Sequence, residues 1–268
     1  MKAGLLPLYV KLYDERVPHL RPRLEKFYEK ITGILEARGI EIVTSPFCRL
    51  ACEFEKTVRA FEDADVSCII TLHMAYSPSL ECEKALTATQ LPIIVMDTTE
   101  TESFGFMQDQ DEILYNHGIH GVMDMCSVLH RNGKQYAICA GHYMDKSFID
   151  RLCGYVKAAE AAKAFRGMTV GTAGGAFPGM GDFYVTEERL KKDFGINVVM
   201  LNEPTPEVRI DDIPSEMERL DRNLCKVSVQ AGAQLRQWLA SIGAGAFTVN
   251  FLEAGGLFAT MPFMEICK

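Results

Sequence analysis

Hydrophobic residues along the chain fall into short continuous runs, separated by longer segments in which apolar residues recur at helical spacing. Continuous apolar runs are typical of strands that are covered on both faces, as in parallel sheets. In the first part of the chain these runs are residues 3–10, 40–44, 66–72, 91–96 and 136–140. Strands that alternate with helices at this interval predict βαβ units and a parallel sheet.

Helices are predicted in most of the segments between these strands. They cover residues 22–38, 50–61, 79–90, 120–130 and 147–165. The exception is a long acidic loop that follows the fourth strand and leads to His117 and His120. Loops that follow strands in α/β proteins are where binding sites usually lie, so we expect this loop to belong to a site.

A second set of elements begins at Met168. Strands are predicted at residues 168–172, 198–201 and 246–251, with helices after Thr186 and over 215–241. Thr186 is a good N-cap because its hydroxyl can accept a hydrogen bond from the first turn, and the acidic residues that follow it suit the positive end of the helix dipole. The fold class is therefore predicted as α/β, with two Rossmann-like three-layer αβα units and mostly parallel sheets. Residues 1–166 form the N-terminal domain, and residues 167–268 form an incomplete central domain that ends in the opening turn of another helix.

Polar and aromatic residues follow most of the predicted strands of the first unit. The carboxyl ends of parallel strands share one edge of a sheet, so residues that are distant in sequence are predicted to converge in one crevice there. The alternative is polarity scattered over unrelated loops. The converging residues are Lys11 with Tyr13, His73 with Tyr76, residues 97–102, and His142.

Composition is that of an ordinary globular protein, with 48% hydrophobic and 24% charged residues. A formal charge of −8 argues against a nucleic-acid or acidic-membrane partner. No apolar run approaches the roughly 20 residues of a membrane span, and the N-terminus lacks the features of a signal peptide. The cysteines are scattered without a C-x-x-C pair, as reduced core thiols are. We therefore expect a cytoplasmic protein.

Familiar catalytic motifs are missing from the sequence. Residues 171–175 are rich in glycine, but their spacing is not the G-x-G-x-x-G of dinucleotide-binding folds. Neither a phosphate-binding loop nor a G-x-S-x-G elbow occurs. No cysteine or acid completes a zinc-ligand spacing around His117 and His120, so these two could also be surface histidines beside a helix start.

Four stretches resemble one family when they are taken together and in order. They are LHMAYSP at residues 72–78, NHGIHG at 116–121, GHYMD at 141–145 and FTVNF at 247–251. Over the whole chain, they resemble the L-arabinose isomerases and their L-fucose isomerase-like relatives. The resemblance implies three α/β regions, a bound divalent metal (typically manganese), the interconversion of an aldose and a ketose, and homo-oligomers with active sites between subunits.

The resemblance also implies roles for individual residues in the first unit. His120 stands where the family has a catalytic histidine that one subunit lends to the sugar site of its neighbour. Tyr76 stands where the family places an aromatic ring against the substrate, and His117 stands where it has a glutamine.

Further substrate-binding positions follow from the same resemblance. Leu12 and Tyr13 match the loop after the family's first strand, and Met180 and Phe251 match apolar residues that line the sugar pocket. Val10 replaces a polar substrate contact, so the preferred sugar is expected to differ.

The metal ligands of the family have no counterpart here. The family holds its metal with two glutamates and two histidines, and the glutamates also act as acid and base. All four fall beyond Phe251, whereas Glu253 and Glu265 come too early to take those roles. We expect Mn²⁺ or another divalent metal in the complete enzyme, no metal on this chain, and no C-terminal catalytic region within these residues.

The resemblance thus predicts the sugar-binding part of a metal-dependent aldose–ketose isomerase, an intramolecular oxidoreductase of carbohydrate metabolism, inactive on its own. Its expected partners are a small sugar and further copies of itself. One alternative is a non-catalytic, two-lobed cytoplasmic sugar sensor. Another is an α/β enzyme that uses His117 and His120 as acid and base without a metal.

Overall fold

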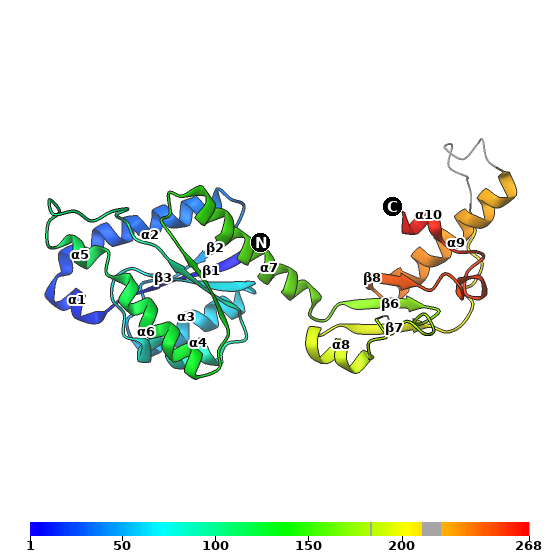
Figure 1. Ribbon diagram of the computed structural model, residues 1–268, viewed down its shortest axis with the longest axis horizontal. Helices are drawn as coiled ribbons and strands as arrows, with labels where there is room; N and C mark the ends of the chain where they lie inside the picture. The colour runs from blue at the N-terminus through cyan, green and yellow to red at the C-terminus, as the bar shows by residue number, and fades with distance from the viewer. Residues whose placement is uncertain (183, 211–220, 268) are drawn as a thin grey trace. The chain divides into compact units, whose positions relative to one another are not determined.

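A computed structural model describes residues 1–182, 184–210 and 221–267 (Figure 1). The chain divides into two compact units, Met1–Lys163 and Ala164–Lys268, next to the predicted boundary between residues 166 and 167. Each unit has a parallel sheet with helices packed on it. The predicted α/β class with parallel sheets is confirmed.

Unit 1 is built on a five-stranded sheet in which every pair of neighbouring strands is parallel. The order of the strands is β2-β1-β3-β4-β5, the order of flavodoxin-like doubly wound sheets. The strands are β1 (Lys2–Leu8), β2 (Glu41–Thr44), β3 (Cys68–His73), β4 (Ile93–Asp97) and β5 (Tyr136–Ala140).

Helices cover both faces of this sheet, as Figure 1 shows. Helices α2 and α7 pack on one face, and α3, α4 and α6 pack on the other. The helices of unit 1 are α1 (Lys11–Arg16), η1 (Pro18–Leu20), α2 (Arg21–Glu36), α3 (Ala51–Asp63), α4 (Ser79–Ala88), α5 (Glu112–Tyr115), α6 (Gly118–Arg131) and α7 (Lys146–Phe165).

The continuous apolar runs of β1, β3 and β4 are explained by this two-sided burial, whereas the edge strands β2 and β5 are partly exposed. In β3, Ile70 and Leu72 belong to the core under α2 and α7, whereas Ile69 belongs to the core under α3, α4 and α6. The first strand ends at Leu8 and not at Val10 as predicted, and Leu12 and Tyr13, which the resemblance placed in a loop, lie in the short helix α1.

Unit 2 has a smaller parallel sheet in the order β7-β6-β8. Ala231 and Leu235 of α9 share a core cluster with Ala173 of β6, so α9 covers one face. The Thr186 hydroxyl accepts a hydrogen bond from Arg189 N at 3.2 Å, which confirms the predicted N-cap. The elements are β6 (Thr169–Ala173), α8 (Glu187–Phe194), β7 (Asn197–Leu201), α9 (Arg222–Ser241), β8 (Ala244–Val249), η3 (Ala254–Gly256) and α10 (Phe263–Ile266).

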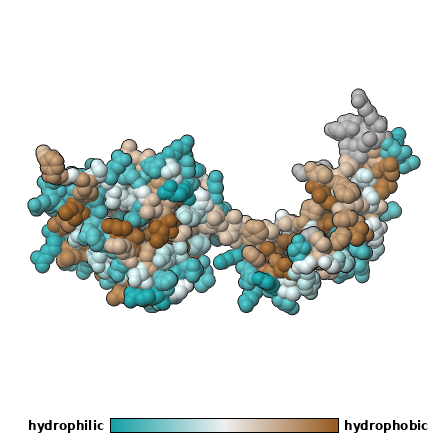
Figure 2. All heavy atoms as spheres, in the orientation of Figure 1, coloured by the Kyte–Doolittle hydropathy of each residue, from teal (hydrophilic) through white to brown (hydrophobic). Residues whose placement is uncertain are grey.

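The helix predicted over residues 215–241 is present from Arg222 onward, and residues 215–220 lie outside the described residues. None of the helices in the described part of the chain is long and apolar enough to cross a membrane. Apolar side chains are exposed in several places on unit 1, as the brown patches in Figure 2 show. In the loop before α5, Phe106 is 98% exposed and Met107 is 84% exposed.

Candidate functional site

The strand order of unit 1 creates a switch point between β1 and β3. The chain leaves β1 through α2 on one face and leaves β3 through α4 on the other face. In open α/β sheets, ligands bind in the crevice outside the carboxyl ends of the strands at such a point. Leu12 and Tyr13 lie in α1, directly after β1, and Tyr76 lies between β3 and α4. Three of the predicted substrate-binding residues therefore flank this switch point.

The predicted convergence of the strand ends follows from the register of the sheet. Leu8 of β1 pairs with His73 of β3, and Asp97 of β4 pairs with Ala140 of β5. Because all these strands are parallel, the polar segments that follow them lie along one edge. Burial raises the pKa of Asp97 at this edge above its ordinary value.

Three predicted residues come together in a row of rings, which we call the ring row: Tyr76, His117 and His120. The centroids of the Tyr76 and His117 rings are 6.0 Å apart, and those of His117 and His120 are 4.4 Å apart. Tyr76 and His117 are half-buried, whereas His120 is exposed. Burial, followed by the neighbouring His120, lowers the pKa of His117 below its ordinary value. His117 therefore favours its neutral form.

The first turns of α6 hold the two histidines in place because they pack closely on His73. A Cβ added to Gly118 would lie 2.8 Å from the His73 carbonyl oxygen. A Cβ added to Gly121 would lie 2.6 Å from His73 Cδ2 and 3.0 Å from the backbone nitrogen of Ser77. Only glycine allows this approach, so His73 fixes the position from which α6 starts.

His73 itself is buried and polar. Only 4% of the residue is exposed, and neither ring nitrogen makes a hydrogen bond of good geometry among the described residues, although the Gly121 backbone is close enough to interact with the ring. Burial lowers the pKa of His73 to about 3, so the imidazole is neutral in the folded protein.

Other unpaired buried polar atoms are concentrated at the same edge of the sheet. Buried polar groups in proteins are nearly always hydrogen-bonded, and exceptions commonly mark places where water or a ligand completes the bonding. Besides the two nitrogens of His73, the atoms at this edge are Tyr9 Oη, Ser77 Oγ, Thr98 Oγ1, His117 Nδ1 and His142 Nδ1. The edge therefore offers unpaired donors and acceptors of the kind that hydroxyl groups bind.

His142, the last polar residue predicted at this edge, lies apart from the ring row. Its ring is 4.5 Å from the ring of Tyr143, and its Nε2 is 3.4 Å from the Glu100 carbonyl oxygen. It therefore contacts the loop after β4.

Met180 and Phe251 belong to unit 2, where both follow strand ends at the carboxyl edge of the sheet. The rings of Phe251 and Phe177 are 5.3 Å apart, and Met180 N donates to the Phe177 carbonyl oxygen at 3.4 Å. Met180 is 45% exposed and Phe251 is 58% exposed. Gly174 supports this arrangement because its φ is 81° and a Cβ there would lie 2.8 Å from Glu253 Cβ. The two predicted residues thus share one loop cluster.

The described residues do not fit the metal cage that the family resemblance implies. Such a cage takes four protein ligands, but residues 1–182, 184–210 and 221–267 contain no group of three or more His, Cys, Asp or Glu side chains that could hold a metal ion.

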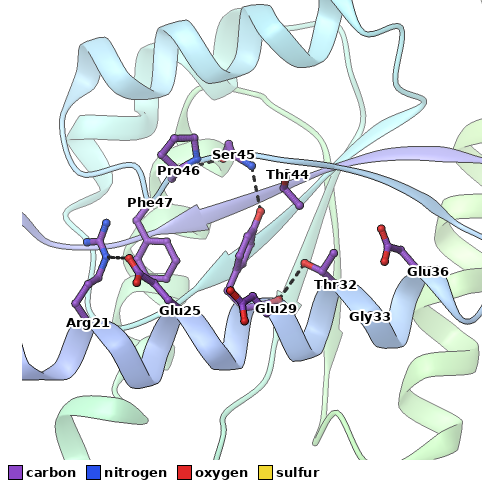
Figure 3. Close-up of a pocket in the computed structure, with 11 residues that line it drawn as sticks. Arg21, Glu25, Glu29, Thr32, Gly33, Glu36, Thr44, Ser45, Pro46 and Phe47 are labelled. Carbon is purple, nitrogen blue, oxygen red and sulfur yellow. Dashed lines mark hydrogen bonds and ion pairs between the residues drawn. The ribbon is translucent and has the colours of Figure 1, made fainter.

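A separate groove of 480 Å³ lies between α2 and the segment after β2 (Figure 3). The guanidinium of Arg21 lies 4.2 Å from the centroid of the Phe47 ring and pairs with Glu25 at 3.0 Å. The Tyr28 hydroxyl donates to the Leu5 carbonyl oxygen at 2.8 Å. None of the predicted site residues lines this groove.

The residues that support the ring row carry little signal of that role in the sequence. The packing of α6 on His73 carries a weak signal in the sequence, because Gly118 and Gly121 are three positions apart and therefore lie on one face of a helix. Arg23, which pairs with Glu100 and Glu112 of the long loop, carries no local signal, because its partners lie 77 and 89 positions away.

Comparisons with known proteins add little to this geometry. No protein-family model matches the chain, and no curated protein matches it. Among solved structures, an ABC sugar transporter (periplasmic sugar binding protein) from Legionella pneumophila is similar at 11% identity with a TM-score of 0.27. That similarity covers 99% of this chain and 74% of the other. A TM-score this low indicates neither fold nor function.

Proposed function

We propose that the chain binds a sugar at the ring row of unit 1 and is the sugar-binding part of a metal-dependent aldose–ketose isomerase. The observation that carries this proposal is the row itself. Tyr76, His117 and His120 come from two separate motifs, yet their rings are neighbours at the carboxyl edge of a doubly wound sheet.

The chemistry of the row suits a polyhydroxylated ring. Tyr76 offers an aromatic face against which the C–H groups of a sugar can pack, and its hydroxyl can donate or accept a hydrogen bond. A neutral imidazole donates at one ring nitrogen and accepts at the other, so it can bind a sugar hydroxyl either as a donor or as an acceptor. The lowered pKa of His117 favours this neutral form at pH 7.

The exposure of His120 supports its proposed role in a neighbouring subunit's site. His117 is half-buried against Tyr76, whereas His120 is the outer and exposed ring of the row. An exposed imidazole at the edge of one subunit can reach a sugar bound by another, so we propose a homo-oligomer in which the row completes a shared site.

We attribute isomerisation to the complete enzyme and derive no step of it from this chain. The transfer of hydrogen between C1 and C2 of a sugar needs a Lewis acid at both oxygens and a carboxylate that moves a proton. The described residues supply no such cage. For this chain, the proposed activity is sugar binding.

Titration with pentoses and 6-deoxyhexoses, followed by NMR or calorimetry, tests the proposal. Loss of one hydrogen bond or one ring contact corresponds to about a fivefold to tenfold loss of affinity. We expect losses of this size for Tyr76→Ala and His120→Ala. The matched controls are Tyr155→Ala in α7 and His130→Ala at the other end of α6, which should bind as the unchanged protein does. Equal affinities for all four variants would refute the proposed site.

A further inference from the structure

A single arginine of α2 contacts both ends of the long loop between β4 and α6. Arg23 Nε donates to Glu100 Oε2 at 2.7 Å, near the start of the loop. Its two terminal nitrogens donate to the two carboxylate oxygens of Glu112, at 2.5 and 2.9 Å. The guanidinium also lies 4.0 Å from the centroid of the Tyr115 ring. The loop is therefore anchored to α2 at both ends.

The geometry of this contact is specific to arginine. A planar guanidinium can bind one carboxylate with two parallel hydrogen bonds, bind a second through Nε and stack on an aromatic ring at the same time, whereas a lysine ammonium cannot. Hydrogen bonding by Arg23, acting against a smaller effect of burial, lowers the pKa of Glu112 below its ordinary value. Glu112 is thus charged when it binds Arg23.

Asn116 connects this anchor to the ring row. Its side-chain oxygen accepts from Thr101 N at 2.9 Å, and its side-chain nitrogen donates to Thr101 Oγ1 at 3.1 Å and to the Glu112 carbonyl oxygen at 2.9 Å. Asn116 is buried and directly precedes His117 in the chain. The contacts therefore run from Arg23 through Glu112 and Asn116 to the first histidine of the row.

We propose that Arg23 is a positioning residue for the sugar site, which sets the place of His117 and His120 by tying the loop of residues 98–117 to α2. It acts through Glu112, Tyr115 and Asn116 and not by touching the sugar. On the other side, His73 fixes the same turn of α6 through Gly118 and Gly121. The histidines are thus held between a buried imidazole and a partly exposed ion-pair network. The sugar-binding part of this inference rests on the proposed function.

The loss of a purely structural ion pair would lower stability and leave the histidines in place, whereas the loss of a positioning residue would move the histidines. Ion pairs of partly exposed side chains contribute little to stability, and the Arg23 side chain is 36% exposed. Arg23→Gln should therefore shift the unfolding midpoint by no more than Arg38→Gln does. Arg38 is the matched control because it pairs with Asp150 of α7, away from the loop.

NMR spectra of the imidazole groups without ligand give the deciding measurement. In Arg23→Gln the signals of His117 and His120 should move, and the pKa of His117 should rise toward its ordinary value as the two rings separate and gain solvent. Arg23→Lys should show most of this change, and Arg38→Gln should show none. Glu112→Gln, which retains Arg23 and removes the charge of its partner, should move the same signals if Arg23→Gln does not fold.

Sugar affinity is the second measurement and separates the two proposals. We expect a several-fold loss in Arg23→Gln and no loss in Arg38→Gln. If the histidine signals move but the unchanged protein binds no sugar, Arg23 still positions the histidines and the proposed function is wrong. If the signals of Arg23→Gln or of a folded Glu112→Gln coincide with those of the unchanged protein, the positioning role is refuted whatever the sugar titration shows.

Discussion

Replacement of Gly121 by alanine tests how closely α6 packs on His73. The added methyl carbon would lie 2.6 Å from His73 Cδ2 and 3.1 Å from His73 Nε2, and the former distance is too short for two carbon atoms. His73 is 4% exposed and cannot move outward, so α6 must shift. Overpacking of this kind costs about 1–3 kcal/mol. The higher helix propensity of alanine stabilises the helix by about 1 kcal/mol, so the net destabilisation is about 1 kcal/mol.

Gly154 in α7 is the matched control for this substitution. It is also inside a helix, but it is exposed and has no atom within 4 Å of an added Cβ. Gly154→Ala should therefore raise the free energy of unfolding by about 0.5–1 kcal/mol. The two variants should differ by about 2 kcal/mol, which follows from the steric contact and not from the type of substitution.

Urea unfolding followed by far-ultraviolet circular dichroism measures this difference. The single tryptophan of the chain, Trp238, lies in unit 2, so its fluorescence reports on that unit and should be unchanged in both variants. If Gly121→Ala stabilises unit 1 as much as Gly154→Ala does, then α6 does not pack on His73 as described.

Two further outcomes are expected. The pKa of His73 is about 3 in the folded protein, against an ordinary value of 6.5 for a solvated histidine, so the unfolded chain takes up the proton first as the pH falls. The neutral His73 therefore contributes to the free energy of unfolding in full above pH 6.5. This contribution, on the order of 5 kcal/mol, is lost as the pH falls toward 3. Urea unfolding between pH 7 and pH 4 should therefore show a shallower loss for His73→Gln than for His19→Gln, and equal slopes would contradict the burial argument. The chain alone should form no ketose from any aldose, with or without added Mn²⁺, and manganese-dependent activity that a chelator abolishes would show that it holds a metal after all.

The strands could be predicted from sequence because a strand covered on both faces must be apolar throughout. Residues 66–72 show this, because every residue of β3 is buried and the predicted run lies within two residues of it. Residues 136–140 coincide with β5 because they are apolar, although β5 is an edge strand in which Ile138 is exposed. The short helix α1 could not be predicted, because six residues are too few for a helical periodicity to emerge. The start of α6 was placed too late because glycine is unfavourable in helices, whereas here Gly118 is needed for the contact with the His73 backbone.

The site was predictable only as far as single motifs allow. The sequence placed Tyr76, His117 and His120 at one edge of the sheet, and the structure places their rings side by side. Arg23 was not predictable, because its importance depends on partners 77 and 89 positions away. Asn116 belongs to a motif, but its role depends on how the long loop folds back on itself to bring Thr101 to it. Periodicity reports which face of an element is buried, but it does not report which partner a charged side chain will bind.

The position of the first residue has a practical consequence for surface-based binding measurements. The carbonyl oxygen of Met1 accepts a hydrogen bond from Glu41 N at 2.9 Å, so the chain enters the sheet at its amino edge. The ring row follows the opposite ends of the strands, and seven residues of β1 separate the two edges by roughly 20 Å. A tag or tether on the amino terminus therefore leaves the sheet on the side away from Tyr76 and His117. Immobilisation through that end keeps the row open to sugars in solution.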